Sequence, residues 1–85
     1  MTDTLSLKLL LDTFEPGDEW TWQEEFEWLE ANHLDRLVQL AMDIQMFGIE
    51  EPILLGNDWR VWDGHHRLCV ARHLDMAYVP VEYVS

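Results

Sequence analysis

The sequence predicts a small single domain over residues 1–85, of the α/β (α+β) class, with a mixed β-sheet and about three helices. Short apolar runs of strand length alternate with longer segments in which apolar residues recur at helical spacing. Apolar residues make up 48% of the chain, which is enough for a packed core. Cys69 is the single cysteine, so an intramolecular disulfide is excluded and packing alone must stabilise the fold.

Before Gly48 the pattern predicts one strand and two helices. Leu5–Leu9 alternates apolar and polar residues, as a half-buried strand does, and Glu15–Asp18 is typical of a turn. A helix is expected from Thr21 to Ala31, with Thr21 or Asp18 as its N-cap. A second helix ends at Gly48 as C-cap. Its apolar stripe consists of Leu34, Leu37, Val38, Ala41 and Ile44.

After Gly48 the pattern predicts two strands, a helix and a last strand. Pro52–Leu55 and Trp59–Trp62 are apolar runs on either side of a Gly-Asn-Asp turn. A third helix is expected from about His65 to Leu74. In the strand Val79–Val84, Pro80 favours an edge position or a strand start, because proline cannot donate to a sheet ladder.

The net charge is −12, and most of it lies in an acidic front, residues 1–35, where ten acidic residues face the single base Lys8. Binding to duplex DNA depends on Lys and Arg neutralising phosphates, so we expect no direct DNA binding. No apolar run approaches the roughly 20 residues of a membrane span, and no basic region precedes an apolar stretch. We therefore expect a cytoplasmic protein that does not enter membranes.

The segment from Asp63 to Arg67 lies where a predicted strand ends and a helix begins. Gly64 allows a ligand to approach the main chain, and the first amides of a helix point outward with partial positive charge. Arg67 can bind a phosphate through two hydrogen bonds. We therefore predict an anion site at Gly64, His65, His66 and Arg67. The competing interpretation is structural, since glycine before a helix is common and either histidine can simply cap the helix or face solvent.

The same segment contains three potential metal ligands: Asp63, His65 and His66. Adjacent histidines rarely converge on one ion without further ligands, and His73 lies two turns along the helix. Cys69, between two apolar residues, fits a buried small hydrophobe better than a ligand. We predict no metal site.

The second half of the chain resembles the ParB N-terminal/sulfiredoxin superfamily. The resemblance rests on an ordered set of motifs over residues 48–84: Gly-Ile-Glu-Glu-Pro-Ile, a short hairpin, Asp63-Gly64-His65-His66-Arg67 opening a helix, and Val79-Pro80-Val81. It implies a nucleotide-binding core over residues 48–84, in which Gly64, His66 and Arg67 hold the phosphates of a nucleoside di- or triphosphate, with or without Mg²⁺. The chain is also similar to small stand-alone ParB-like nuclease domain proteins carried by bacteriophages.

Departures from the family pattern leave catalysis open. His65 stands where sulfiredoxins have their catalytic cysteine, which makes sulfiredoxin chemistry unexpected. The Glu-Asn-x-x-Arg segment of ParB proteins does not follow the last predicted strand, so CTP hydrolysis is in doubt. The motif Asp-Gly-His-His-Arg is similar to the corresponding motif of free-serine kinases. These kinases have a catalytic glutamate, and its nearest counterpart in this sequence is Glu19 or Asp18. Candidate catalytic residues are thus Glu19, Asp63 and His65.

The acidic front also contains Trp20, Trp22, Phe26 and Trp28. One interpretation is that Trp22, Phe26 and Leu29 pack a helix on the sheet while the acidic residues face water. The other is a non-catalytic interaction protein that meets a basic host or phage protein through tryptophan anchors with an acidic rim. In a variant of that hypothesis the carboxylates imitate the phosphates of DNA.

Overall fold

The computed structural model describes residues 3–17 and 19–84. Four helices and four strands follow one another along the chain. They are β1 (Asp3–Ser6), α1 (Leu7–Thr13), α2 (Trp22–Asn32), α3 (Leu34–Phe47), β2 (Ile53–Gly56), β3 (Val61–Asp63), α4 (His65–His73) and β4 (Tyr78–Val84). The α+β class predicted from the sequence is therefore confirmed.

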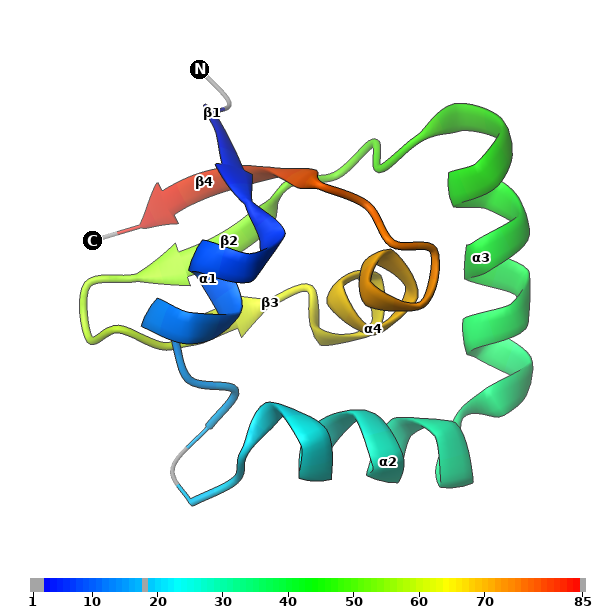
Figure 1. Cartoon of the computed structure of the whole chain (residues 1–85), viewed down its shortest axis with the longest axis horizontal. Helices are drawn as coiled ribbons and strands as arrows, with labels where there is room; N and C mark the ends of the chain where they lie inside the picture. The colour runs from blue at the N-terminus through cyan, green and yellow to red at the C-terminus, as the bar shows by residue number, and fades with distance from the viewer. Residues whose placement is uncertain (1–2, 18, 85) are drawn as a thin grey trace.

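The strands form one mixed sheet with the order β1-β4-β2-β3. β4 pairs antiparallel with β1 and parallel with β2, while β2 and β3 form an antiparallel hairpin with a register shift after Leu54. In Figure 1 the sheet lies on one side, α4 is seen nearly end-on beside it, and α2 and α3 form an L around α4. The strand–helix junction before α4 consequently lies between the sheet and α3.

The core fills the space between the sheet and the helices. Its fully buried side chains come from the inner face of the strands, from α1 and α2, and from the middle of α4. Among them are Phe26, Leu10, Ile53, Leu55, Leu68, Val79 and Val81. Because α4 buries four consecutive residues, Leu68 to Ala71, its position relative to the sheet is tightly fixed.

The first strand and the helix after it differ from the prediction. Leu5–Leu9 was expected to be extended, but the strand ends at Ser6, whose side chain accepts from the Leu9 amide and caps α1. Leu7, Leu10 and Phe14 are buried, and their spacing is that of a helix. Alternation over five residues was too short a signal to separate a strand from a helix start.

Pro80 does not lie in an edge strand, because β4 is flanked by β1 and β2. Pairing between β4 and β2 begins at the pair Ile53 and Val81, one residue after the proline. Pro80 is paired with Thr4 on the other side only. Both positions expected from the sequence are wrong, because β4 is a central strand and already begins at Tyr78. Pro80 is accommodated because its side toward β2 precedes the first pair of that ladder.

The termini of the helices follow the sequence signals. Thr21 caps α2 in a capping box: its hydroxyl accepts from the Glu24 amide, and the Glu24 carboxylate accepts from the Thr21 amide. Gly48 ends α3 with φ of 75°, a conformation that favours glycine. Asp18, the other N-cap candidate, lies outside the described residues.

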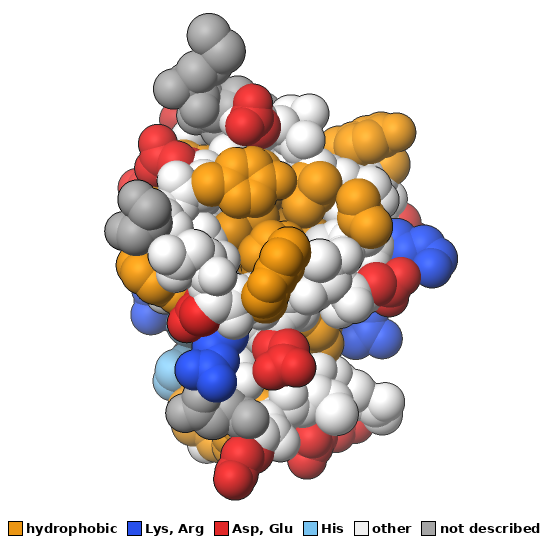
Figure 2. Space-filling model, turned by 90° about the vertical axis from the view of Figure 1, so that its left-hand side faces the viewer, with side chains coloured by type: hydrophobic (Ala, Val, Ile, Leu, Met, Phe, Trp, Pro, Cys, Tyr) orange, Lys and Arg blue, Asp and Glu red, His pale blue; other side chains and the backbone are white. Residues whose placement is uncertain are grey.

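Figure 2 shows one side face of the molecule, on which apolar side chains gather at the centre and Asp and Glu side chains lie around them. The exposed aromatic residues of the β2–β3 connection and of β4 include Trp59 and Tyr83.

Within residues 3–17 and 19–84, no helix combines the length and apolar character that crossing a membrane requires.

Candidate functional site

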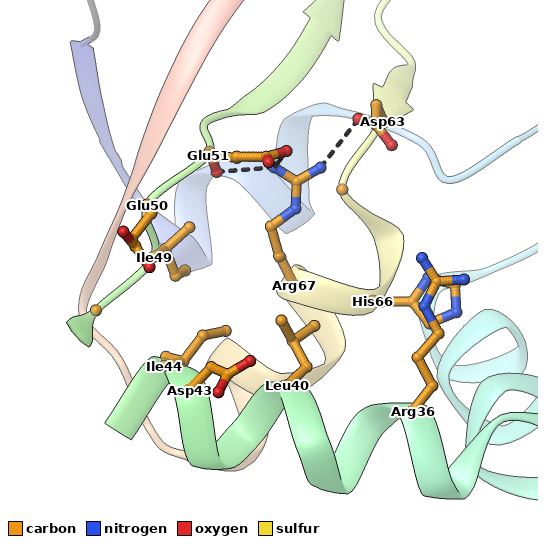
Figure 3. A pocket seen from close by; sticks show the side chains of 12 residues that line it. Arg36, Leu40, Asp43, Ile44, Ile49, Glu50, Glu51, Asp63, His66 and Arg67 are labelled. Atoms are coloured by element: carbon orange, nitrogen blue, oxygen red, sulfur yellow. Dashed lines mark hydrogen bonds and ion pairs between the residues drawn. The ribbon is translucent and has the colours of Figure 1, made fainter. Parts of the chain in front are cut away.

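A hollow of about 360 Å³ lies between α3, the segment before β2 and the first turn of α4 (Figure 3). Gly64, His66 and Arg67 of the predicted anion site contribute to its lining. The remaining lining residues are Arg36, Leu40, Asp43, Ile44, Gly48, Ile49, Glu50, Glu51 and Asp63. The strand-to-helix junction therefore opens into a real concavity.

Gly64 forms the junction between β3 and α4. Its φ of 113° and ψ of 16° place it among backbone conformations that side chains disfavour. A Cβ atom at this position would lie 2.7 Å from the Ile53 Cδ1 atom, so the strand also leaves no room for a side chain. The first intrahelical bond of α4 joins the Leu68 amide to the Gly64 carbonyl. The amides of residues 65–67 thus have no acceptor within the helix, as at any helix N-terminus.

Arg67 serves as a tether between the helix and the sheet. Its Nη1 donates to the carbonyl oxygens of Glu51 at 2.8 Å and Pro52 at 2.9 Å, and its Nη2 donates to Asp63 Oδ2 at 3.0 Å. Figure 3 shows the guanidinium between Glu51 and Asp63. The side chain is 14% exposed. Most of its donors are therefore used to hold β2 and the end of β3 against α4.

His65 and His66 lie on different sides of the helix start. His65 Nε2 is 2.7 Å from the Pro16 carbonyl oxygen, which can only accept, so Nε2–H donates. The same ring lies 5.8 Å from that of Trp22. His65 thus fastens the loop before α2, whereas His66 lines the hollow.

His66 is paired with His33, the residue between α2 and α3. Their rings are nearly parallel, with centroids 5.2 Å apart, and His33 Nδ1 is 3.0 Å from His66 Nε2. One of these two nitrogens must accept, so the hydrogen bond requires at least one neutral ring. Burial lowers the pKa of His66 below its ordinary 6.5. Smaller lowering effects come from the charges of Arg36, His33, His65 and Arg67.

This pKa shift predicts a pH dependence of stability. Because the folded state holds His66 neutral, the unfolded chain binds the proton more readily, and the free energy of unfolding falls as pH drops through about 6.5. Urea unfolding measured from about pH 8 to about pH 6 checks this. We expect His66→Gln to flatten the slope. Parallel curves for the wild type and His66→Gln would contradict the assignment.

The candidate catalytic residues are not brought together. Asp63 lines the hollow, but its carboxylate is paired with Arg67. Glu19 lines a different hollow, beside Trp20 and Asp12. His65 is bound to the Pro16 carbonyl. Asp18 lies outside the described residues.

The contribution of α3 to the site was not predicted from the sequence. Arg36 and Asp43 reach the hollow from this helix, and His33 supports His66 from the residue before it. Helical periodicity could have placed Arg36 and Asp43 on the polar side of α3. It carried no information about which element that side would meet.

The hollow contains both signs of charge. Arg36, Arg67 and the helix N-terminus are positive, whereas Asp43, Glu50, Glu51 and Asp63 are negative. Among the described residues, no three His, Cys, Asp or Glu side chains are arranged to hold a metal ion. A metal bound here would thus need ligands supplied with it, such as phosphate oxygens.

The aromatic residues of the acidic front divide into two groups. Phe26 and Leu29 are buried, and the half-buried Trp22 donates from Nε1 to the Phe14 carbonyl at 2.7 Å. Trp20 and Trp28 are exposed. One face of the segment therefore packs on the core, as the first interpretation expects, and two tryptophans remain at the surface.

No family model matches the sequence, and none of the curated proteins matches it. Among solved structures, the chain is similar to a Pnob8-like ParB-N domain, with a TM-score of 0.62 and 14% sequence identity. The similarity covers 98% of this chain and 29% of that chain. The chain has a ParB-N-like fold, which confirms the resemblance at the level of fold.

Proposed function

We propose that this ParB-N-like chain binds the phosphates of a nucleoside di- or triphosphate in the hollow beside Gly64. The observation that carries the proposal is the junction itself: the first amides of α4 have no acceptor in the helix and adjoin a concavity. Arg36 extends from α3 toward His66 in this hollow (Figure 3). A phosphate there would meet amides, one arginine and the helix dipole together.

The carboxylates of the same hollow determine how the ligand must bind. Asp43, Glu50 and Glu51 repel a bare polyphosphate, in a chain that already has a net charge of −12. A Mg²⁺ ion carried on the phosphates would offset this repulsion. We therefore expect affinity to be modest and to increase with Mg²⁺.

Binding without turnover is the form of the function that the candidate residues favour. His65 and Asp63 are both engaged in hydrogen bonds, and Glu19 lies elsewhere. A general base must reach the proton it removes. Of these three residues Asp63 alone lines the hollow, and its Oδ2 accepts from Arg67, so we propose a binding or sensing role.

Calorimetric titration with a panel of nucleoside di- and triphosphates, with and without Mg²⁺, tests the proposal. Arg36→Ala should weaken binding about tenfold or more, because one charge-assisted contact is lost. Arg72→Ala is the matched control, since it removes the same charge from α4 at the ring of Phe26. Equal affinity in the two variants, or no heat with any nucleotide, would refute the site.

A second candidate function is favoured by the exposure of Trp20 and Trp28 beside the carboxylates of α2. Exposed tryptophans with an acidic rim suit a basic protein partner of host or phage origin. In a variant of this function, the same carboxylates take the place of DNA backbone phosphates when the partner binds. Loss of partner binding on reversing Glu24, Glu25 and Glu27 distinguishes this function from nucleotide binding.

A further inference from the structure

Helix α3 carries a second apolar row that the core does not use. Leu34, Val38 and Met42 follow one another at intervals of four residues, and all three are exposed. Helical spacing predicts that Leu34 and Val38 belong to the same apolar stripe as Leu37. In the structure only Leu37 and Ile44 of α3 are buried. The helix therefore has an apolar row beside its core-facing side.

This row borders a groove between α3 and α4. The α3 groove, as we call it, has a volume of about 590 Å³. Its lining consists of Leu34, Leu37, Val38, Ala41, Met42 and Gln45 from α3, Cys69, Val70 and His73 from α4, and Glu30 from α2. Methionine and leucine side chains adapt to apolar partners, and grooves of this kind accept the apolar face of a helix.

The charges near the groove are mainly acidic. Glu30 is part of the lining, and α2 also carries Glu24, Glu25 and Glu27. Burial, as the largest cause, and the charges of Glu30 and Glu25 together raise the pKa of the Cys69 thiol to about 11. Of these two carboxylates, Glu30 belongs to the groove lining. Arg72 opposes them, but its guanidinium lies over the Phe26 ring.

We propose that the α3 groove binds an amphipathic α-helix of a partner protein. The apolar residues of that helix would recur every three or four positions and enter the groove, and Lys or Arg residues at its edge would meet Glu30. This proposal does not depend on the nucleotide site. Arg36 and Asp43 line the other hollow, so α3 separates the two sites.

The test uses a labelled synthetic helix of leucine and lysine, about 14 residues or four turns long, with its leucines on one face. Fluorescence anisotropy measures its binding to the full chain. Val38→Glu should weaken binding about tenfold or more, because it places a charge in the groove. Leu9→Glu is the matched control, since Leu9 and Val38 are both 52% exposed and Leu9 lies on α1, outside the groove. This variant should bind within about twofold of the wild type.

Two further measurements test the charge and the site. A peptide with glutamate in place of every lysine should not bind, and Glu30→Lys should slow association of the basic peptide. In NMR spectra of the labelled protein, the amides that shift on binding should belong to α3 and α4. Shifts spread over the whole surface, or equal binding by Val38→Glu and Leu9→Glu, would mean attraction to the net charge alone and would overturn the proposal.

A second copy of the chain is the alternative occupant of the α3 groove, and sedimentation tests it. If sedimentation shows a concentration-dependent dimer that Val38→Glu abolishes and the peptide does not displace, the occupant is another copy and the proposed partner helix is wrong. A monomer that binds the basic peptide supports the proposal.

Discussion

Replacing Gly64 with alanine is expected to lower the free energy of unfolding by about 2–5 kcal/mol. Roughly 1–2 kcal/mol comes from forcing a side chain into a positive-φ conformation, and about 1–3 kcal/mol from crowding against Ile53. Small domains of 85 residues have a total stability of roughly 4–13 kcal/mol, so this loss is a large share. Urea unfolding followed by tryptophan fluorescence measures it.

A double-mutant cycle separates the two contributions to this loss. Ile53→Val removes the Cδ1 atom, which is 2.7 Å from the position of the added Cβ. In the Ile53→Val background, Gly64→Ala should therefore cost less by about 1 kcal/mol, while the backbone cost persists. If the two substitutions are additive, Ile53 does not crowd position 64, and the explanation reduces to the backbone alone.

Replacing Arg67 with alanine is expected to lower the free energy of unfolding by about 2–3 kcal/mol. The substitution leaves the Glu51 and Pro52 carbonyls and the Asp63 carboxylate without their donors. The pair with Asp63 contributes little of this, because that carboxylate is largely exposed. Most of the loss comes from the two carbonyls at the entrance to β2.

Two other variants show whether this effect is specific to the guanidinium. Arg67→Lys should recover less than half of the loss, because one ammonium cannot match a planar fork that reaches three acceptors. Arg36→Ala should change stability by less than about 0.5 kcal/mol, since Arg36 is exposed. Nucleotide affinity that falls in Arg36→Ala without a change in stability would separate ligand binding from folding. Equal stability losses in Arg67→Ala and Arg36→Ala would contradict the tether.

Local sequence signals were sufficient to predict the helix ends and the strand–helix junction, where the backbone conformation or a cap requires a particular residue type. Gly48 ends α3, Thr21 caps α2, and Gly64 joins β3 to α4, all as the sequence predicted. Each is decided by the backbone conformation or by a hydrogen bond within three or four residues. Such features depend little on the rest of the fold.

The sequence was insufficient where distant segments decide the outcome. Arg67 was predicted to hold phosphate. In the structure its Nη1 donates to the carbonyls of Glu51 and Pro52, about 15 residues earlier in the chain. Val38 belongs to an apolar stripe whose neighbours could not be known without the packing of α3 on α4. Such partners follow from the topology of the sheet and helices rather than from periodicity.

The sheet order also determines when the domain can fold. β4 is the last strand along the described chain, yet it lies between β1 and β2 and joins them into one sheet. During synthesis, the segment before Tyr78 holds β1 and the β2–β3 hairpin without the strand that connects them. Contacts between β1 and β4 span more than 70 residues, and such long-range pairing slows folding. Until β4 emerges from the ribosome, the edges of β1 and β2 with which it pairs lack their partner, and unpaired strand edges favour aggregation.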